Sequence, residues 1–305
     1  MESVDPLDYL RLVALVLFWY LGVVAVIVVA GVVFGLVAKR GDVMDEAQAR
    51  VFGGVRVSPW MRLPGLVAEV GFQALAFFMQ GLHRLRLLPI PRGDGGGPPV
   101  LVIHGYTENA GTMWLMARGL RRRGFDVVQL DFPSTFAPME SNVTFLRDRI
   151  AEIRAAHGGE PVAVVAHSMG GVVTRALTLS EPDHGVRCLI AIASPFRGTY
   201  IARLGHILRL GLSTRDMSIG SAFMQRYSPD RKMPVPAVSI VAMQEDIVVP
   251  EWSVVVDGLD VQLIPWPYGH LAPCFLPSTC EWIAAWLDAA GVARQGRPPS
   301  VAQDE

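Results

Sequence analysis

A single serine, Ser168, stands between an apolar run and two glycines in residues 162–172, VAVVAHSMGGV. The run Val162–Ala166 is expected to be a strand, and a helix is expected to follow it. In a nucleophile elbow the serine lies on a tight, strained turn between such elements, and its flanking residues must be small because strand and helix pass close together. Ala166 and Gly170 meet this requirement. The stretch therefore predicts a nucleophilic serine, in an A-x-S-x-G version of the G-x-S-x-G pattern.

A serine hydroxyl is a poor nucleophile until a base takes its proton, and the chain has seven histidines that could act as that base. His270 is the best placed, because it comes just after the last expected strand, Val261–Ile264. His184 and His206 fall in a loop and in a cap-like region. His167 adjoins the serine, but its side chain should point elsewhere on such a turn. We therefore predict that His270 is the base.

A catalytic histidine needs a carboxylate that fixes its tautomer and stabilises the imidazolium. The expected strand Ala237–Val241 is followed by a loop that offers Glu245 and Asp246. Either could serve, and we favour Asp246 because its D-x-V-V-P context places it in the loop leaving the strand. Ser168, Asp246 and His270 then form a predicted catalytic triad in the chain order Ser…Asp…His.

The stretch His104-Gly105-Tyr106 directly follows another apolar run, Val100–Ile103. Acyl transfer builds up an oxyanion, which two backbone N–H groups can stabilise. One comes from the residue after the nucleophile, here Met169, and the other from the loop after an early strand, here Tyr106. Gly105 would let the backbone approach the oxyanion closely.

From Val100 onwards the expected elements alternate between strands and helices. The expected strands are Val100–Ile103, Phe125–Leu130, Val162–Ala166, Cys188–Ala193, Ala237–Val241 and Val261–Ile264. The expected helices are Ala110–Arg123, Phe145–Ala156, Val172–Leu179 and Glu281–Ala290. Such apolar strands predict a mostly parallel sheet with helices on both faces, with ligands bound at the carboxyl ends of the strands. Residues 200–236, between two strands, are interpreted as a small helical cap, with plain surface helices as the alternative.

These motifs resemble the α/β-hydrolase superfamily, and within it the bacterial triacylglycerol lipases and related lipase-like esterases. The matching segments are VIHGY (102–106), VAHSMGG (165–171), SPFRGT (194–199) and the contexts of Asp246 and His270. The resemblance covers roughly residues 99–290 and implies an α/β-hydrolase fold. It also implies cleavage of carboxylic esters through an acyl-enzyme, with no cofactor. The chain has no H-e-x-x-H motif or clustered Cys/His spacing, so no metal site is predicted.

The segment Leu12–Ala38 carries no charged residue. As a helix it would be roughly 40 Å long, which exceeds the ~30 Å hydrocarbon core of a bilayer. Its apolar part is too long for a secretory signal, and buried core helices rarely run this far without a polar face. We therefore predict a membrane anchor over residues 1–40, with a single span over 12–38.

Charges on the two sides of this span indicate its orientation. The N-terminal side carries Glu2, Asp5, Asp8 and Arg11, and the C-terminal side carries Lys39, Arg40, Arg50, Arg56 and Arg62. Because basic residues favour the cytoplasmic side, we predict a single-pass protein of the inner membrane whose catalytic domain is cytoplasmic. A periplasmic domain remains an open alternative.

Residues 41–98 form a juxtamembrane region in this interpretation, and residues 89–99 are a linker by composition. Within it, residues 66–88 are apolar but interrupted by polar side chains, which favours a helix on the membrane surface or one packed on the domain. The tail 291–305 is polar and expected to be disordered. Cys274 and Cys280 are close enough in sequence to form a disulfide, which the sequence leaves open.

The expected partners are a lipid or acyl-ester substrate and the membrane. The net charge of −1 argues against a general nucleic-acid binder. An acyltransferase of the same fold, in which an alcohol replaces water, remains an alternative. So does a catalytically silent membrane protein, although such a protein has no reason to retain a full triad and oxyanion loop.

Overall fold

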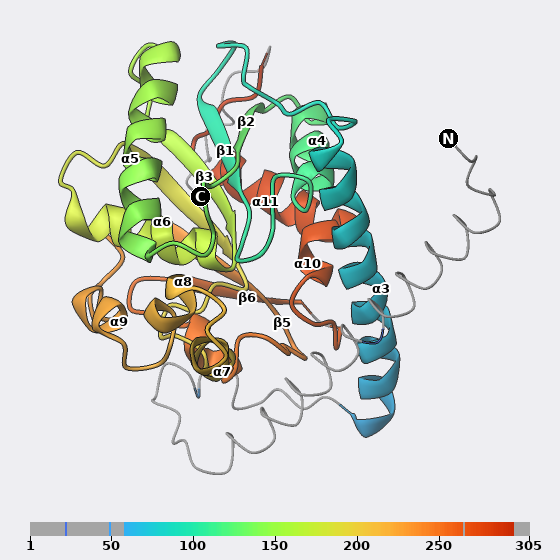
Figure 1. The fold of residues 1–305 in the computed structure, drawn as a ribbon. Coiled ribbons are helices and arrows are strands. Elements are labelled where there is room, and N and C mark those ends of the chain that lie inside the picture. The colour runs from blue at the N-terminus through green and yellow to red at the C-terminus, as the bar shows by residue number, and fades with distance from the viewer. Residues whose placement is uncertain (1–21, 23–48, 50–57, 265, 296–305) are drawn as a thin grey trace, which may run out of the picture.

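A computed structural model describes residues 22, 49, 58–264 and 266–295 (Figure 1). In these residues six parallel strands form one sheet, in the order β2-β1-β3-β4-β5-β6. The strands are β1 (Pro99–Ile103), β2 (Asp126–Leu130), β3 (Val162–His167), β4 (Val186–Ile192), β5 (Ala237–Ala242) and β6 (Asp260–Ile264). The predicted parallel sheet is confirmed. The predicted span 12–38, apart from residue 22, and positions 296–305 of the predicted tail lie outside the described residues.

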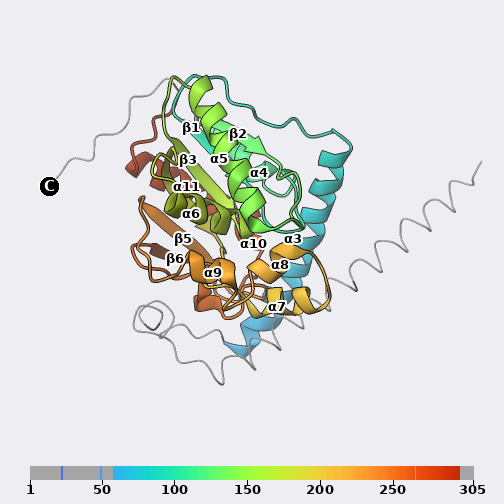
Figure 2. The same cartoon turned by 60° about the vertical axis from the view of Figure 1, so that its left-hand side comes forward.

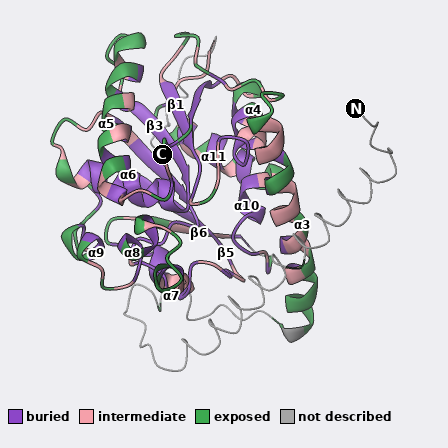
Figure 3. Ribbon diagram, viewed as in Figure 1, coloured by how far each residue is buried: buried purple, intermediate pink, exposed green. Residues whose placement is uncertain are grey.

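Helices cover both faces of the sheet (Figure 1). They are α4 (Trp114–Arg122), α5 (Met139–Ala156), α6 (Met169–Ser180), α10 (Ala272–Phe275) and α11 (Pro277–Ala289). Successive strand side chains alternate between two cores, so that Leu101 and Val164 pack with α5 and α6. Val100 and Val165 pack with α4 and α11 on the other face. Both faces are covered, so β1 to β5 are buried along most of their length, whereas the edge strand β6 is partly exposed (Figure 3).

The strand order reverses between β1 and β3, because the chain moves outward from β1 to β2 and then returns to the other side of β1. In an open parallel sheet, such a switch point leaves a crevice at the carboxyl ends of the two strands. His104 follows β1 there and Ser168 follows β3. The topology therefore brings the two strongest sequence motifs to the same place.

The segment between β4 and β5 forms three short helices, α7 (Tyr200–Ile207), α8 (Leu212–Asp216) and α9 (Ala222–Arg226), grouped below the sheet in Figure 2. A 3-10 turn, η1 (Glu251–Val254), follows β5. The start of α8 is tied to the loop after β2, since the Leu212 N–H donates to the Phe136 carbonyl at 2.8 Å. The Ser213 hydroxyl donates to the Thr135 carbonyl at 2.6 Å. The cap-like segment is thus fastened over the carboxyl edge of the sheet.

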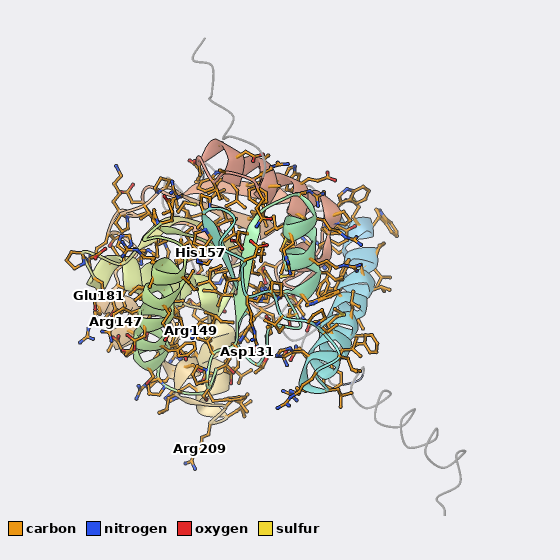
Figure 4. The ribbon with its side chains drawn as sticks, turned by 90° about the horizontal axis from the view of Figure 1, so that it is seen from above. Asp131, Arg147, Arg149, His157, Glu181 and Arg209 are labelled. Atoms are coloured by element: carbon orange, nitrogen blue, oxygen red, sulfur yellow. The ribbon has the colours of Figure 1, made fainter. Side chains whose placement is uncertain are left out.

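A long helix, α3 (Pro59–Arg84), lies along the side of the domain next to α10 (Figure 1). Its inner face is buried at Glu69, Ala76 and Met79, and near its end His83 Nε2 lies 2.7 Å from Asp131 Oδ2 (Asp131 is labelled in Figure 4). By length and composition alone, α3 could also cross a membrane. Of the two positions left open for residues 66–88, packing on the domain is observed. The outer face of α3 remains exposed.

Candidate active site

Ser168 lies on the turn between β3 and α6 with φ 50° and ψ −117°. A positive φ is rare for a residue with a side chain and is characteristic of a strained functional turn. Ala166 is fully buried, and a Cβ added to Gly170 would lie 2.8 Å from the His104 carbonyl oxygen. The small residues on either side of the serine are therefore required by close packing, as the elbow interpretation predicts.

A second glycine of the elbow has a role that the sequence interpretation missed. A Cβ added to Gly171 would lie 2.1 Å from Ser194 Oγ and 2.8 Å from Ser194 Cβ. The helix α6 can therefore lie close to the end of β1 because residue 170 is glycine, and close to the end of β4 because residue 171 is glycine. The doubled glycine in the sequence was the available signal.

Replacing Gly170 with alanine is expected to lower both stability and activity. The new methyl group would meet the His104 backbone, which cannot move without displacing the loop that carries Tyr106. Overpacking of this kind costs about 1–3 kcal/mol. Thermal unfolding and ester turnover of the purified protein would measure both effects. In the control Gly81→Ala, no atom lies within 4 Å of the new Cβ, so Tm should stay the same or rise.

His270 is buried after β6, and its side chain is paired with a carboxylate. That carboxylate belongs to Glu245, whose Oε1 lies 2.7 Å from His270 Nδ1. The same oxygen accepts hydrogen bonds from the Ile247 and Val248 amides at 3.1 and 3.2 Å, which fixes its position. Burial alone would raise the pKa of Glu245, but His270 and these amides lower it, so the carboxylate is held ionised.

The assignment of Asp246 as the acid partner of His270 is therefore corrected by this geometry. Asp246 Oδ1 accepts the backbone N–H of His270 at 2.9 Å, so the aspartate holds the main chain of the histidine and not its ring. Asp246 is fully buried, and burial together with the charge of Glu245 raises its pKa to about 7. The two adjacent acids thus have different tasks at the same histidine.

The loop predicted to hold the oxyanion lies against Ser168. A Cβ added to Gly105 would be 2.9 Å from Ser168 Cβ, so the main chain passes Ser168 at close range. Met169 is the first residue of α6, and its N–H is one of those that a helix leaves without an internal partner. The Tyr106 hydroxyl donates to the Leu210 carbonyl, which links this loop to the cap. The positions of Tyr106 and Met169 are compatible with the two predicted N–H donors.

His104 shapes this loop as a neutral side chain. Its Nε2 lies 3.2 Å from the Phe132 amide nitrogen, a donor, and its Nδ1 lies 2.9 Å from the Gly105 carbonyl oxygen, an acceptor. These partners assign the ring proton to Nδ1. Burial lowers the pKa of His104, which agrees with a neutral ring.

A second buried histidine–carboxylate pair lies beside the first. His167 Nδ1 is 2.9 Å from Glu108 Oε1, and its ring centroid is 4.6 Å from that of His270. Burial would lower the pKa of His167, but Cys274 and the Glu108 carboxylate raise it well above its usual value. His167 Nε2 lies 3.3 Å from the His270 carbonyl oxygen, so both ring nitrogens face acceptors. His167 thus contacts Glu108 and the main chain of His270, and it supports the loop of His270.

Glu69 of α3 also reaches this loop, which the sequence interpretation missed. Its carboxylate oxygens accept from the Leu271 amide at 2.7 Å and from the Ala272 amide at 3.3 Å. Glu69 is the only acidic residue between Ser58 and Leu88, and that isolation in an apolar segment was the available signal. A helix outside the sheet therefore supplies a buried carboxylate to the loop that follows His270.

The three cysteines, Cys188, Cys274 and Cys280, are buried and free, so the disulfide that the sequence left open is not formed. Burial raises the pKa of the Cys274 thiol, and His167 opposes this shift. The Glu108 carboxylate is paired with His167 Nδ1 at 2.9 Å.

Comparison with known proteins gives a family model, described as alpha/beta hydrolase fold, that matches residues 98–208. The lysosomal thioesterase PPT2 homolog of Drosophila melanogaster is 28% identical over 135 residues, which is 43% of this chain and 45% of that protein. Lysosomal thioesterase PPT2-B of Xenopus laevis is 27% identical over 107 residues, which is 33% of this chain and 37% of that protein. The chain thus spans less than half the length of both relatives.

Two solved structures share the fold at low sequence identity. Aspergillus fumigatus lipase B superposes with a TM-score of 0.56 at 21% identity, over 72% of this chain and 59% of that protein. Est1E from Butyrivibrio proteoclasticus superposes with a TM-score of 0.50 at 16% identity, over 64% and 88% of the two chains. The resemblance that the motifs indicated is confirmed, and the chain has the α/β-hydrolase fold.

Proposed function

We propose that this chain is a membrane-tethered serine hydrolase that cleaves carboxylic esters of lipids or long-chain acyl groups. One observation carries the proposal: Ser168 sits on a strained elbow at the sheet edge where His270 is paired with Glu245. A silent binding protein has no need for a strained serine beside a buried histidine that is paired with an ionised carboxylate.

The proposed reaction passes through an acyl-enzyme. His270 Nε2 takes the Ser168 proton as Oγ attacks the ester carbonyl, and the N–H groups of Tyr106 and Met169 hold the oxyanion. The imidazolium then protonates the leaving alcohol. In the second half the same nitrogen activates a water that releases the acid. Glu245 stays ionised throughout and stabilises the imidazolium.

The cap supports an apolar acyl chain as the substrate. Its residues Phe223 and Met224 are buried, while Ile207, Leu208 and Leu210 expose apolar side chains near the Tyr106 loop. The names of the similar proteins, lipase and thioesterase, agree with acyl transfer to water. Since both sequence relatives are thioesterases, an acyl thioester is the second candidate substrate, cleaved by the same steps with a thiol as leaving group.

A fluorophosphonate probe tests the proposal directly, because it forms a stable adduct only with an activated serine. We expect mass spectrometry to locate the adduct on Ser168. The variant Ser168→Ala should fold, take up no label and hydrolyse no p-nitrophenyl ester. An unlabelled Ser168, or ester turnover by the alanine variant, would refute the assignment.

Matched substrates separate the two leaving groups. Hydrolysis of an oxygen ester and of a thioester with the same acyl chain should be compared at equal concentration. A higher kcat/KM for the thioester would identify the chain as a thioesterase, and the reverse would identify it as a carboxylesterase or lipase.

The tether in this proposal is the predicted span Leu12–Ala38, with the catalytic domain on the cytoplasmic side of the inner membrane. A reporter fused after Glu305 tests the orientation. Reporter activity in the periplasm would reverse it.

A further inference from the structure

Exposed apolar side chains gather on the cap beside the oxyanion loop. Ile207, Leu208 and Leu210 lie in or just after α7, and Leu208 is 60% exposed. The Tyr106 hydroxyl bonds to the Leu210 carbonyl, so this patch borders the loop that faces Ser168. We name these three residues the entrance patch.

A second group of apolar side chains is contributed by α3 and the loop after β6. Trp60 and Leu63 are 89% and 68% exposed, and Trp266 is 58% exposed. A Cβ added to Gly65 would lie only 1.9 Å from the Pro267 carbonyl oxygen, so the first half of α3 lies against this loop. We name Trp60, Leu63 and Trp266 the tryptophan patch.

Both patches lie at the carboxyl edge of the sheet. The Gln244 side chain, just after β5, donates to the Arg62 carbonyl at 3.1 Å, which holds the start of α3 at that edge. In Figures 1 and 2, α7 and the N-terminal end of α3 both lie at the lower end of the molecule. The carboxyl edge of the sheet, where Ser168 lies, is therefore flanked by apolar surface on two sides. Exposed apolar surface of this kind on a domain marks an interaction site.

Basic side chains lie near the entrance patch. Arg203 and Arg209 lie in or just after α7, whereas Arg215 is paired with Asp216 at 2.9 Å. The Arg209 side chain points away from the body of the molecule (Figure 4). In α3 the only acidic residue is Glu69, which is buried. Arginines beside exposed tryptophan and leucine fit the headgroup region of an anionic bilayer, where tryptophan is enriched.

The position of α3 on the domain determines how it can meet a bilayer. Its inner face is packed, and Glu69 bonds to the loop after His270, so α3 cannot cross a membrane without leaving the domain. Its N-terminal end is the one joined to the predicted span. The connecting residues 39–57 reach at most roughly 65 Å when fully extended, so the bilayer is within range of both patches.

We propose that the entrance patch and the tryptophan patch together dock the domain on the surface of the anionic bilayer that holds the predicted span. The carboxyl edge of the sheet then faces the lipid, and a substrate passes from the bilayer into the site without crossing water. The role given to this docking, which is access of a lipid substrate to the site, rests on the proposed function. The docking itself can be measured without any assay of activity.

The test uses the full chain reconstituted into vesicles of phosphatidylcholine and phosphatidylglycerol. An environment-sensitive NBD label is attached at Leu63→Cys, Leu208→Cys or Phe78→Cys, because the native cysteines are buried. Phe78 is the matched control: it is 59% exposed on the same helix, about 22 Å further along the axis. Lipid carrying a bromine or nitroxide quencher in its acyl chains reports contact with the bilayer.

We expect the labels at 63 and 208 to lose most of their emission and the label at 78 to keep it. Replacing phosphatidylglycerol with phosphatidylcholine should weaken the quenching at 208. Unquenched labels at 63 and 208 would overturn the proposal, and so would quenching at 78, which would mean that α3 lies flat on the membrane. Blue-shifted but unquenched labels would mean that protein, from a second copy or another segment, covers the patches. The labels report contact with the bilayer and not turnover. Failure of the docking proposal would therefore leave the proposed ester hydrolysis untouched, and the reverse also holds.

Discussion

Glu245→Gln is expected to reduce kcat on the order of 10³- to 10⁴-fold, while Asp246→Asn leaves most of the activity. The glutamine amide removes the negative charge 2.7 Å from His270 Nδ1 and can present an N–H to a nitrogen that must itself donate. The imidazolium then loses its stabilising anion, and the ring loses the orientation that aims Nε2 at the serine. Steady-state hydrolysis of a p-nitrophenyl ester measures the difference.

Asp246→Asn is the control because its carbonyl oxygen can still accept the His270 backbone N–H. Burial raises the pKa of Asp246 to about 7, so a neutral side chain resembles the state present below that pH. Matching Tm values would show that both variants are folded. Equal damage by the two substitutions, or greater damage by Asp246→Asn, would contradict the assignment of Glu245.

Glu69→Ala is expected to lower kcat by about 10- to 100-fold and to lower Tm as well. Alanine leaves the Leu271 and Ala272 amides buried without an acceptor, at about 1–3 kcal/mol per group. The loop that carries His270 then loses its support, and a displacement of 1 Å at a catalytic group can cost about 100-fold in rate. In this proposal Glu69 is a positioning residue that acts through the loop of His270.

Met79→Ala provides the matched control for Glu69. Met79 is also buried on the inner face of α3, but it packs near Gly111 and not against the loop of His270. It should lower Tm while kcat of the folded protein stays close to that of the wild type. An equal loss of kcat in both variants would mean that α3 packing matters and the Glu69 carboxylate does not.

The pH dependence of stability should change in Glu69→Gln. Burial, and then the charge of Asp246, raise the pKa of Glu69 from 4.5 to about 8. The Glu69 carboxyl group binds its proton more tightly in the folded than in the unfolded protein. Protonated Glu69 therefore contributes to the free energy of unfolding in full below pH 4.5, and this contribution is lost as the pH rises to about 8. The glutamine variant, which keeps one acceptor oxygen, should lose less stability across this window. Denaturant titrations at pH 5 and pH 8 would measure the free energy of unfolding of both proteins. An identical change between the two pH values in wild type and variant would exclude the effect.

The sheet and the strained turn at Ser168 were predictable from the sequence because each depends on local pattern. Strands buried on both faces must be apolar along their whole length, and Val162–His167 is one of them. Ser168 needs small neighbours within two positions, which a short motif records. His270 could be selected by its place after the last strand.

The acid could not be chosen in the same way. Glu245 and Asp246 are adjacent, so their order along the chain and their distance from the strand hardly differ. The choice depends on the loop backbone, which turns Glu245 towards the ring and Asp246 towards the main chain of His270. Glu69 was hidden for another reason: its partners lie about 200 positions away in the chain, and only the packing of α3 brings them together.

The position of Glu69 also changes where the N-terminal boundary of the functional domain lies. The family model starts at residue 98, directly after a glycine-rich stretch. By that boundary alone, the residues before it would be dispensable for catalysis. Yet Glu69, which lies before this stretch, accepts a hydrogen bond from the loop that follows His270. A protein trimmed at residue 98 would keep every strand, the serine and the histidine. It would lack the Glu69 carboxylate that holds the loop of His270.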